Sequence, residues 1–387
     1  MTANNPGIYI HIPFCISKCK YCAFLSAPTR EEERAKYVEY LTKEIAMRAR
    51  QCEGKVFDTV YFGGGTPSVL TDKQLATIMD ALRANYVIAD DAEITLEANP
   101  GTLGDSDEEV LGRLKNLRDI GFNRLSMGVQ SMDDDRLKFI GRIHDAETVR
   151  RDLKLARKAG FDNINLDIIF SIPGETTEDA LNDIRQIAEL GPEHISFYSL
   201  QLEEGTELFR MWENREFEEV SDEEDRETYH RGAKLLEELG YERYEISNFA
   251  KLGRRSRHNS KYWAMVEYSG QGLGASGYIG GARYVNESGM AEYCEAIDSG
   301  VLPTAEEHLN SRHDDLSEKI FTGLRRREGV SYDELGMSRE DLEEYYKDVW
   351  SEAESFARSG HLIISDEGLR LSEMGIDISN RIMALFV

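Results

Sequence analysis

Residues 9–24 read Tyr9-Ile-His-Ile-Pro-Phe-Cys15-Ile-Ser-Lys-Cys19-Lys-Tyr-Cys22-Ala-Phe24. Three thiolates at the spacing C-x3-C-x2-C can each bind one iron of a [4Fe–4S] cluster from a single short loop. The fourth iron then has no protein ligand, which leaves a coordination position for a small molecule. When that molecule is S-adenosylmethionine, the reduced cluster can break its carbon–sulfur bond and release a deoxyadenosyl radical. We therefore predict such a cluster on Cys15, Cys19 and Cys22.

A structural zinc site is the alternative interpretation of this loop, with His11 as the fourth ligand beside the three cysteines. Zinc motifs usually pair their ligands in two separated knuckles, and this sequence supplies no second pair. The other two cysteines, Cys52 and Cys294, stand alone and are expected to be buried thiols. Three cysteines within eight residues favour a metal centre over disulfides in a reducing compartment.

Six short β-rich runs alternate with amphipathic segments in the first half of the chain. The expected strands are Ile8–Ile12, Val56–Phe62, Glu93–Ala98, Arg124–Val129, Asn163–Ile169 and His194–Leu200. Strands and helices that alternate at this pitch indicate a parallel sheet with helical crossovers. Six units are too few for a closed eight-stranded barrel. The predicted fold is α/β, a partial (β/α)6 barrel, and a flat doubly wound sheet is the alternative.

The pattern of the chain changes after this alternation. A highly acidic helical stretch leads into a segment rich in glycine and aromatic residues, and the last part reads as helices followed by a hairpin, Leu362–Leu371. We expect a barrel domain over residues 1–240, an irregular region that completes the barrel over 241–304, and a small helical, winged-helix-like domain over 305–387.

Polar and glycine-rich motifs follow the expected strands, where parallel α/β sheets bind their ligands. The loop Gly63-Gly64-Gly65-Thr66-Pro67 follows the second strand, and glycines let the backbone approach a ligand closely. Four further groups lie at or beyond the ends of later strands: Glu97, Gln130, Arg142 and Asp167. Each could be an ordinary polar residue, but together they suit the ribose and the zwitterionic end of S-adenosylmethionine. Tyr9 and Tyr21 flank the cysteines, where they could pack or contact a nucleoside.

Composition excludes several classes of function. Acidic residues outnumber basic ones 72 to 46 in the 387 residues, for a formal net charge of -26. Phosphate backbones would repel such a surface, so we expect no nucleic-acid partner. No apolar run approaches the roughly 20 residues that span a bilayer, and Met1–Gly7 lack the features of a signal peptide, so we expect a cytoplasmic protein. The run Arg325–Arg327 is expected to be solvated surface.

Four further motifs carry a resemblance to a known family. They are Gly-Gly-Gly-Thr-Pro-Ser, Glu97-Ala-Asn-Pro-Gly, Ser126-Met-Gly-Val-Gln-Ser and Gly141-Arg-Ile-His. Together with the cysteine loop they resemble the HemN family of radical S-adenosylmethionine proteins, through nearly the whole chain. The resemblance implies cofactor contacts at Tyr9, Tyr21, Gly64, Gly65, Thr66, Glu97, Gln130, Arg142 and Asp167.

The family has two branches, and three features of this chain look like the HemW branch of haem chaperones. Coproporphyrinogen oxidases of the family carry a further cysteine after the third ligand, whereas Ala23 and Phe24 follow Cys22 here. The oxidases also carry a long amino-terminal extension, whereas the strand before the cluster begins near Ile8. The run His258-Asn-Ser-Lys-Tyr-Trp263 resembles the H-N-x-x-Y-W motif that is implicated in haem binding.

This resemblance implies a protein that binds haem and passes it to apo haem proteins of the respiratory chain. His258 could ligate the iron, Tyr262 and Trp263 offer flat surfaces to the porphyrin, and Arg254, Arg255 and Arg257 could pair with the propionates. His258 could equally be a loop histidine that bonds to the backbone. We expect membrane contact only through a partner, and a homodimer is compatible with the sequence. Two alternatives stay open: an enzyme acting on a tetrapyrrole, either an oxygen-independent coproporphyrinogen III oxidase or a methyltransferase, and a purely structural metal-binding protein.

Overall fold

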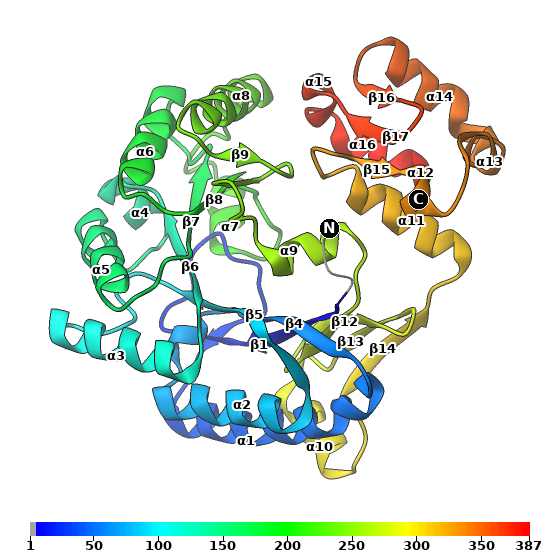
Figure 1. The fold of residues 1–387 in the computed structure, drawn as a ribbon. Coiled ribbons are helices and arrows are strands. Elements are labelled where there is room, and N and C mark those ends of the chain that lie inside the picture. Colours follow the sequence, from blue (N-terminus) through cyan, green and yellow to red (C-terminus); the bar gives the residue numbers. More distant parts are fainter. Residues whose placement is uncertain (1–4) are drawn as a thin grey trace.

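The computed structural model describes residues 5–387, so Met1–Asn4, on which part of the signal-peptide argument rests, lie outside the described residues. Six parallel strands form the first part of the fold (Figure 1). Their bounds are β1 (Gly7–Ile12), β4 (Val56–Gly64), β5 (Val87–Ala98), β6 (Arg124–Gln130), β7 (Ile164–Phe170) and β8 (His194–Ser199). They are hydrogen-bonded in this order, each parallel to the next. The six predicted strands and their parallel arrangement are therefore confirmed.

Helices follow these strands along the chain, and the longer ones cover the outside of the curved sheet (Figure 1). They are α1 (Glu31–Arg48), α2 (Asp72–Asn85), α3 (Asp107–Ile120), α4 (Asp134–Phe139), α5 (Ala146–Lys158), α6 (Thr177–Glu189), α7 (Glu207–Glu213) and α8 (Asp222–Glu238). Alternation along β1 shows why the barrel forms. Ile8, Ile10 and Ile12 are fully buried in the apolar core that α1 shares, whereas Tyr9 and His11 lie on the opposite face of the strand. The outer face is thus apolar and the inner face polar.

Residues 241–304 are more regular than the sequence suggested. They contain β9 (Glu242–Arg243), β10 (Asn248–Ala250), α9 (Arg257–Trp263), β11 (Tyr268–Gln271), β12 (Ser276–Ile279), β13 (Ala282–Asn286) and α10 (Met290–Asp298), and β14 (Thr304–Leu309) begins at their last residue. Strand β11 pairs in parallel with β1, and β10 pairs antiparallel with β8, so both ends of the sheet are extended. The expectation of an irregular region is corrected. Its strands are short and pair with partners far away in the sequence.

The C-terminal part of the chain packs around its own apolar core. It contains α11 (Arg312–Gly323), β15 (Val330–Ser331), α12 (Tyr332–Leu335), α13 (Arg339–Tyr345), α14 (Lys347–Arg358), β16 (Leu362–Ile364), β17 (Gly368–Leu371), α15 (Glu373–Ile376) and α16 (Ser379–Met383). The predicted hairpin is present as β16 and β17, which pair antiparallel. The fold is therefore a partial (β/α)6 barrel with a smaller helical domain that carries a β-wing.

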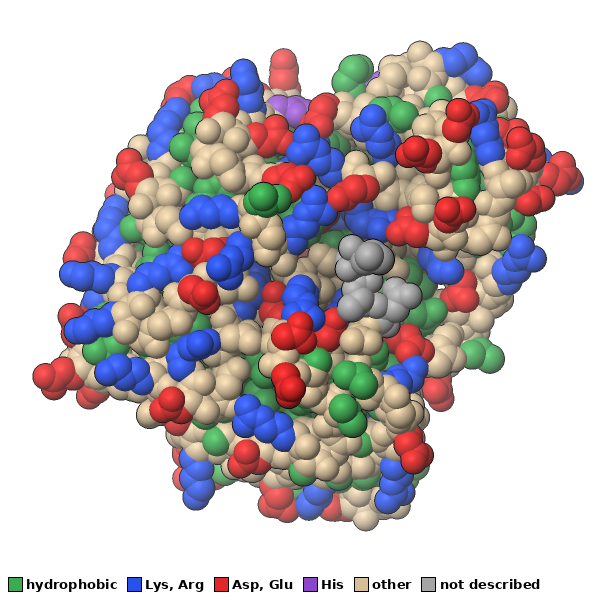
Figure 2. All heavy atoms as spheres, in the orientation of Figure 1, with side chains coloured by type: hydrophobic (Ala, Val, Ile, Leu, Met, Phe, Trp, Pro, Cys, Tyr) green, Lys and Arg blue, Asp and Glu red, His purple; other side chains and the backbone are tan. Residues whose placement is uncertain are grey.

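The core of this C-terminal domain, centred on residues such as Trp350 and Leu342, is separate from the barrel core. We keep the division into residues 1–240, 241–304 and 305–387 as a proposal, but β14 (Thr304–Leu309) pairs with β13 of the barrel sheet and so crosses its second boundary. Acidic and basic side chains are mixed over the face of the molecule in Figure 2, and several basic ones lie where the barrel meets the C-terminal domain. Within residues 5–387, no helix is both long and apolar enough to cross a membrane.

Candidate functional site

The cysteine loop leaves the carboxyl end of β1 and is closed at its base by a short pair of strands. Here β2 (Phe14–Cys15) pairs in parallel with β3 (Ala27–Pro28). The backbone N–H of Lys20 donates to the carbonyl of Ile140 at 3.1 Å, which ties the loop to the segment after β6. Cys15, Cys19 and Cys22 are free and half-buried, and all three thiols line one cavity at the mouth of the barrel.

This arrangement tests the two metal interpretations. Among the described residues, no three His, Cys, Asp or Glu side chains converge as they would around a single metal ion. His11 is also engaged: its Nδ1 lies 2.9 Å from the Tyr9 hydroxyl, and its Nε2 lies 3.1 Å from the Leu25 carbonyl. The zinc site with His11 as fourth ligand therefore does not fit. Three thiols around one cavity do fit a cluster in which each sulfur binds a different iron.

Two side chains donate hydrogen bonds to the cysteine sulfurs. The Thr66 hydroxyl lies 3.4 Å from Cys15 Sγ, and Arg142 Nη1 lies 3.4 Å from Cys19 Sγ. Hydrogen bonds to the sulfurs are one means by which a protein sets a cluster's reduction potential. Thr66 and Arg142 therefore serve the sulfurs as well as facing the cavity.

The cavity at the barrel mouth brings together most of the residues expected to hold the cofactor. Those that line it are Tyr21, Gly64, Gly65, Thr66, Glu97, Gln130, Arg142 and Asp167. Tyr9 does not line it, but its ring lies beside that of Tyr61, 6.3 Å between centroids. The cavity measures about 130 Å³, below the range typical of sites for small organic ligands. The cysteine loop forms one wall of this cavity.

Sequence reasoning missed a residue that links several of these groups. The side chain of Asn99 donates to the Thr66 hydroxyl at 2.9 Å and accepts from Arg142 Nη2 at 2.6 Å. It therefore holds the two donors that contact the sulfurs. Asn99 lies inside the motif Glu97-Ala-Asn-Pro-Gly, of which only Glu97 was predicted to be a site residue. Tyr198 was also missed; its hydroxyl donates to Gln130 at 3.2 Å.

The glycine loop fits tightly under the cysteine loop. Gly64 has φ +108°, and a Cβ there would lie 2.4 Å from the His11 ring. A Cβ on Gly65 would lie 2.6 Å from the Phe14 carbonyl oxygen. The N–H groups of Gly65 and Thr66 donate to the carbonyls of Ile12 and Phe14. Only glycine allows this close approach of the two loops.

Buried carboxyl groups dominate the electrostatics below the cavity. Burial raises the pKa of Glu97 to about 7, although hydrogen bonds from the Tyr61 hydroxyl and the Gly64 N–H act in the opposite direction. Burial also raises the pKa of Asp167. A cationic ligand that entered this space would stabilise both carboxylates, because an opposite charge nearby favours the ionised form. The site is therefore suited to a sulfonium or an ammonium group.

His258 lies inside the barrel, at the end opposite the cysteines. It is fully buried on α9, with Nδ1 2.8 Å from the Thr59 hydroxyl and Nε2 2.8 Å from the Tyr262 hydroxyl. Its backbone N–H donates to Glu93 at 3.1 Å. Burial lowers the pKa of His258 to about 3, and the charges of Lys261 and Arg124 act in the same direction. In this conformation neither ring nitrogen is free to bind an iron.

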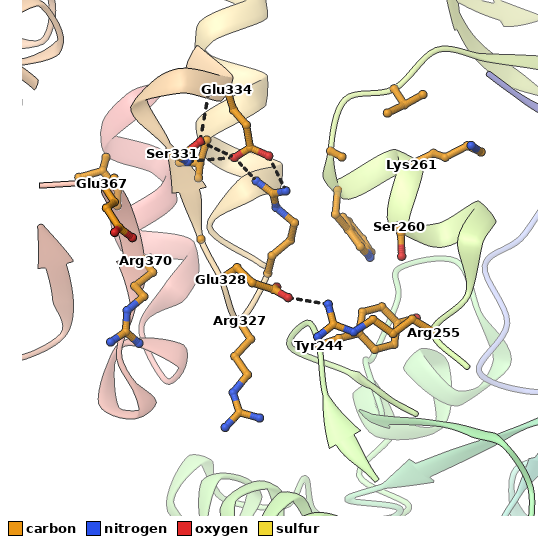
Figure 3. A pocket seen from close by; sticks show the side chains of 18 of the residues that line it. Tyr244, Arg255, Ser260, Lys261, Arg327, Glu328, Ser331, Glu334, Glu367 and Arg370 are labelled. Atoms are coloured by element: carbon orange, nitrogen blue, oxygen red, sulfur yellow. Dashed lines mark hydrogen bonds and ion pairs between the residues drawn. The ribbon is translucent and has the colours of Figure 1, made fainter. Parts of the chain in front are cut away.

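The other residues expected around haem are divided by α9. Trp263 lines a large cavity of about 1170 Å³ between the barrel and the C-terminal domain, together with Arg257 and with Arg255, which is labelled in Figure 3. His258 and Tyr262 do not line this cavity. Arg254 lies outside it, 3.8 Å from Asp162. The expectation that histidine, aromatics and arginines share one surface is therefore corrected: helical rotation places His258 and Trp263 on different sides of α9.

Comparisons with known proteins agree with this geometry. Residues 9–187 match the radical SAM superfamily, and residues 310–378 match the HemN C-terminal domain. The chain is 34% identical to the heme chaperone HemW of Bacillus subtilis over 98% of both chains. It is 38% identical to the heme chaperone HemW of Escherichia coli over 70% of both. The solved structure of the coproporphyrinogen III oxidase HemN from Escherichia coli shares the fold, with a TM-score of 0.85, 23% identity, and coverage of 100% of this chain and 91% of that one.

Proposed function

The chain belongs to the HemW family of heme chaperones, and from this premise we propose that it binds a [4Fe–4S] cluster, S-adenosylmethionine and haem and delivers haem to respiratory haem proteins. The observation that supports the cofactor part is the single cavity shared by three free thiols, two donors to their sulfurs and a set of buried polar groups. The family relationship supports the haem part.

In this proposal Cys15, Cys19 and Cys22 hold the cluster. When bound, the cluster supplies an electron and an open iron site for the amino and carboxylate groups of S-adenosylmethionine. The residues of the chain position that ligand: Gly64 and Gly65 let the backbone approach it, and Glu97 accepts from its polar groups. Delivery of haem by a chaperone does not require that the cofactor be cleaved, so the proposal needs only that S-adenosylmethionine is bound.

Haem is proposed to bind at α9. Because both nitrogens of His258 have hydrogen-bond partners in the structure, ligation of iron by this residue requires that it leave Thr59 and Tyr262. A movement of α9 would provide this, and it would expose a site that is buried in the free protein. We propose that the protein works in the cytoplasm, where free cysteines such as these stay reduced, with apo haem proteins as partners.

The cluster proposal is tested by anaerobic reconstitution with iron and sulfide. Wild-type protein should develop the broad absorbance of an iron–sulfur cluster, and Cys19→Ala should lose it. Cys52→Ala is the matched control, because Cys52 is a buried thiol outside the site. Equal absorbance from Cys19→Ala and wild type would remove Cys19 from the cluster.

The haem proposal is tested by titration with haemin and then by transfer. Wild-type protein should give a Soret shift that is weakened in His258→Ala; an unchanged titration would remove His258 from the haem site. Loaded protein mixed with a candidate apo haem protein should lose haem to it, at a rate that depends on the cluster. Vinyl products formed from coproporphyrinogen and a reductant would instead support the oxidase reaction and overturn the chaperone proposal.

A further inference from the structure

We propose that the large cavity between α9 and the C-terminal domain is the binding site for the dicarboxylate edge of haem, with Arg327 and Arg370 as partners of the two propionates and Trp263 against the ring. This inference rests on the proposed function of haem binding. It adds a role for the C-terminal domain, and it uses residues outside the H-N-x-x-Y-W motif.

The cavity is built from both halves of the molecule. One wall comes from α9 and the residues around it, and the other from the segment after α11 and from the β-wing (Figure 3). Its volume of about 1170 Å³ slightly exceeds the usual range for sites that bind small organic ligands. It is roughly nine times the volume at the barrel mouth. The site is therefore complete only when the C-terminal domain is in place.

The charge of the cavity differs from that of the whole protein. The lining includes six cationic and five acidic side chains, whereas the chain as a whole has a formal charge of -26. Most of the cations are already paired. Arg326 is held by Glu334 through two hydrogen bonds of 2.9 Å, and Arg255 is held by Glu242 and Glu328.

Two arginines remain available for a ligand. Among the described residues, Arg370 makes no ion pair and no side-chain hydrogen bond. Arg327 has one ion pair, with Glu237 at 3.2 Å, and both side chains of that pair are more than two-fifths exposed. Such an exposed ion pair contributes little to stability, so Arg327 can exchange Glu237 for another carboxylate at little cost. Figure 3 shows Arg327 and Arg370 extending in the same direction from the C-terminal domain. Two separate guanidinium groups match a ligand with two carboxylates.

Trp263 supplies a flat wall and an unpaired donor. Its Nε1 is buried and has no hydrogen-bond partner among the described residues, which is uncommon for a buried polar atom. The guanidinium of Arg325 lies 4.6 Å from the centroid of the indole ring. Trp263 also lines a neighbouring cavity of about 350 Å³ with Tyr262, Tyr268 and Tyr278. These surfaces suit a large flat ring, whereas a simple phosphate ligand would leave them unused.

The position of Tyr262 connects this cavity to the proposed iron ligand. Tyr262 lines the smaller cavity that Trp263 shares, and its hydroxyl bonds to His258 Nε2. A ring that displaced Tyr262 would therefore remove one of the two partners of His258. Binding at the arginines would come first in this scheme, and iron ligation would follow when α9 moves. Of the run Arg325–Arg327, which was expected to be solvated surface, Arg326 and Arg327 line this cavity, whereas Arg325 stacks on Trp263 and pairs with Glu245.

The test is a haemin titration of the full-length protein with Arg327→Gln, Arg370→Gln and the double variant. We expect the dissociation constant to rise about tenfold for each single change, since hydrogen bonds to charged groups are stronger than neutral ones. The Soret wavelength should stay that of wild type, because the iron ligand is unchanged. Arg358→Gln is the matched control, because Arg358 lies on α14 of the same domain and is exposed. Glu237→Gln controls for loss of the Arg327 pair, and it should not weaken binding.

Haemin dimethyl ester, added with a mild detergent, distinguishes carboxylate recognition from a general effect on folding. The ester should bind wild type and the double variant equally, and Arg370→Lys should keep more haemin affinity than Arg370→Gln. Failure of wild type to bind haemin would overturn the proposed function itself. Normal haemin binding by both wild type and the double variant would overturn this inference and leave the chaperone proposal intact. Competition by inorganic phosphate that abolishes haemin binding at millimolar concentration would also count against a haem-specific site.

Discussion

The ring of Tyr61 lies against the ring of His258, with 5.1 Å between the centroids and 23° between the planes. The hydroxyl of Tyr61 donates to Glu97 Oε1 at 2.6 Å. Glu97 lines the cavity at the barrel mouth, and His258 belongs to α9 at the opposite end. One side chain therefore touches both the proposed cofactor site and the proposed haem ligand, which gives the two sites a direct physical connection through the barrel.

The two contacts of Tyr61 can be separated by substitution. Tyr61→Phe keeps the ring stack on His258 but removes the donor to Glu97. Because this hydrogen bond lowers the pKa of Glu97, its loss leaves the carboxyl more protonated, and we expect the cationic S-adenosylmethionine to bind up to about tenfold more weakly. The haemin spectrum should not change. Tyr61→Leu removes both contacts and should alter both measurements. Wild-type affinity of Tyr61→Phe for the nucleoside, measured by equilibrium dialysis, would show that this hydroxyl plays no part in binding.

The donor from Thr66 to Cys15 should tune the reduction potential of a reconstituted cluster. Thr66→Val removes the hydroxyl with little change in volume, and the more negative reduced cluster loses more stabilisation than the oxidised one. We expect the potential to fall by roughly 20–60 mV, the equivalent of one hydrogen bond in a one-electron couple. Thr66→Ser keeps the hydroxyl and serves as the control. Potentiometric titration that gave the same value for all three proteins would contradict this role.

Much of the barrel follows from local sequence patterns. The alternation of Ile8, Ile10 and Ile12 with Tyr9 and His11 predicts a strand with one apolar face, and the structure has it. The cofactor residues were found because parallel strands place their carboxyl ends at one edge, where the motifs lie. Asn99, although quoted within a motif, was not predicted as a site residue because its role depends on contacts with Thr66 and Arg142, which come from other loops.

The parts that the sequence did not predict depend on long-range packing. Strand β11 pairs with β1, about 260 residues earlier in the chain, and no local pattern reveals such a pairing. His258 was expected near Trp263 because the two share a motif, but the contacts of α9 with β4 bury the histidine and leave the indole at a cavity. Arg327 and Arg370 meet at one cavity only because the β-wing packs beside the segment after α11.

His258 should make the protein less stable to unfolding as the pH falls. Its pKa is lowered to about 3 in the folded state from about 6.5 in the unfolded chain, so the unfolded state binds more protons between these values. The stabilising contribution is fully present above pH 6.5 and is lost below it, by about 1.4 kcal/mol between pH 7.5 and pH 5.5.

The measurement is urea unfolding of wild type and His258→Gln at both pH values. Glutamine does not titrate, so the difference in stability between the two proteins should shrink by that amount at the lower pH. Glu97 titrates in the opposite sense in both proteins and cancels in the comparison. A difference that is constant with pH would mean that the imidazole is not held neutral in the folded protein.

Gly65 should be the glycine on which the cysteine loop depends most directly. Its φ is ordinary, so substitution tests packing alone: an added Cβ would meet backbone atoms of Ile12 and Phe14 at 2.6–2.9 Å. These atoms cannot rotate away as a side chain would, and we expect Gly65→Ala to destabilise the protein by about 1–3 kcal/mol and to lower the yield of reconstituted cluster. Gly112→Ala is the control, because nothing lies within 4 Å of its added Cβ on α3, and alanine in a helix should stabilise it by up to about 1 kcal/mol. Urea unfolding measures the change in stability, and cluster absorbance measures the yield of reconstituted cluster. A Gly65→Ala protein with wild-type stability and cluster content would show that the glycine loop and the cysteine loop can separate without loss of the site.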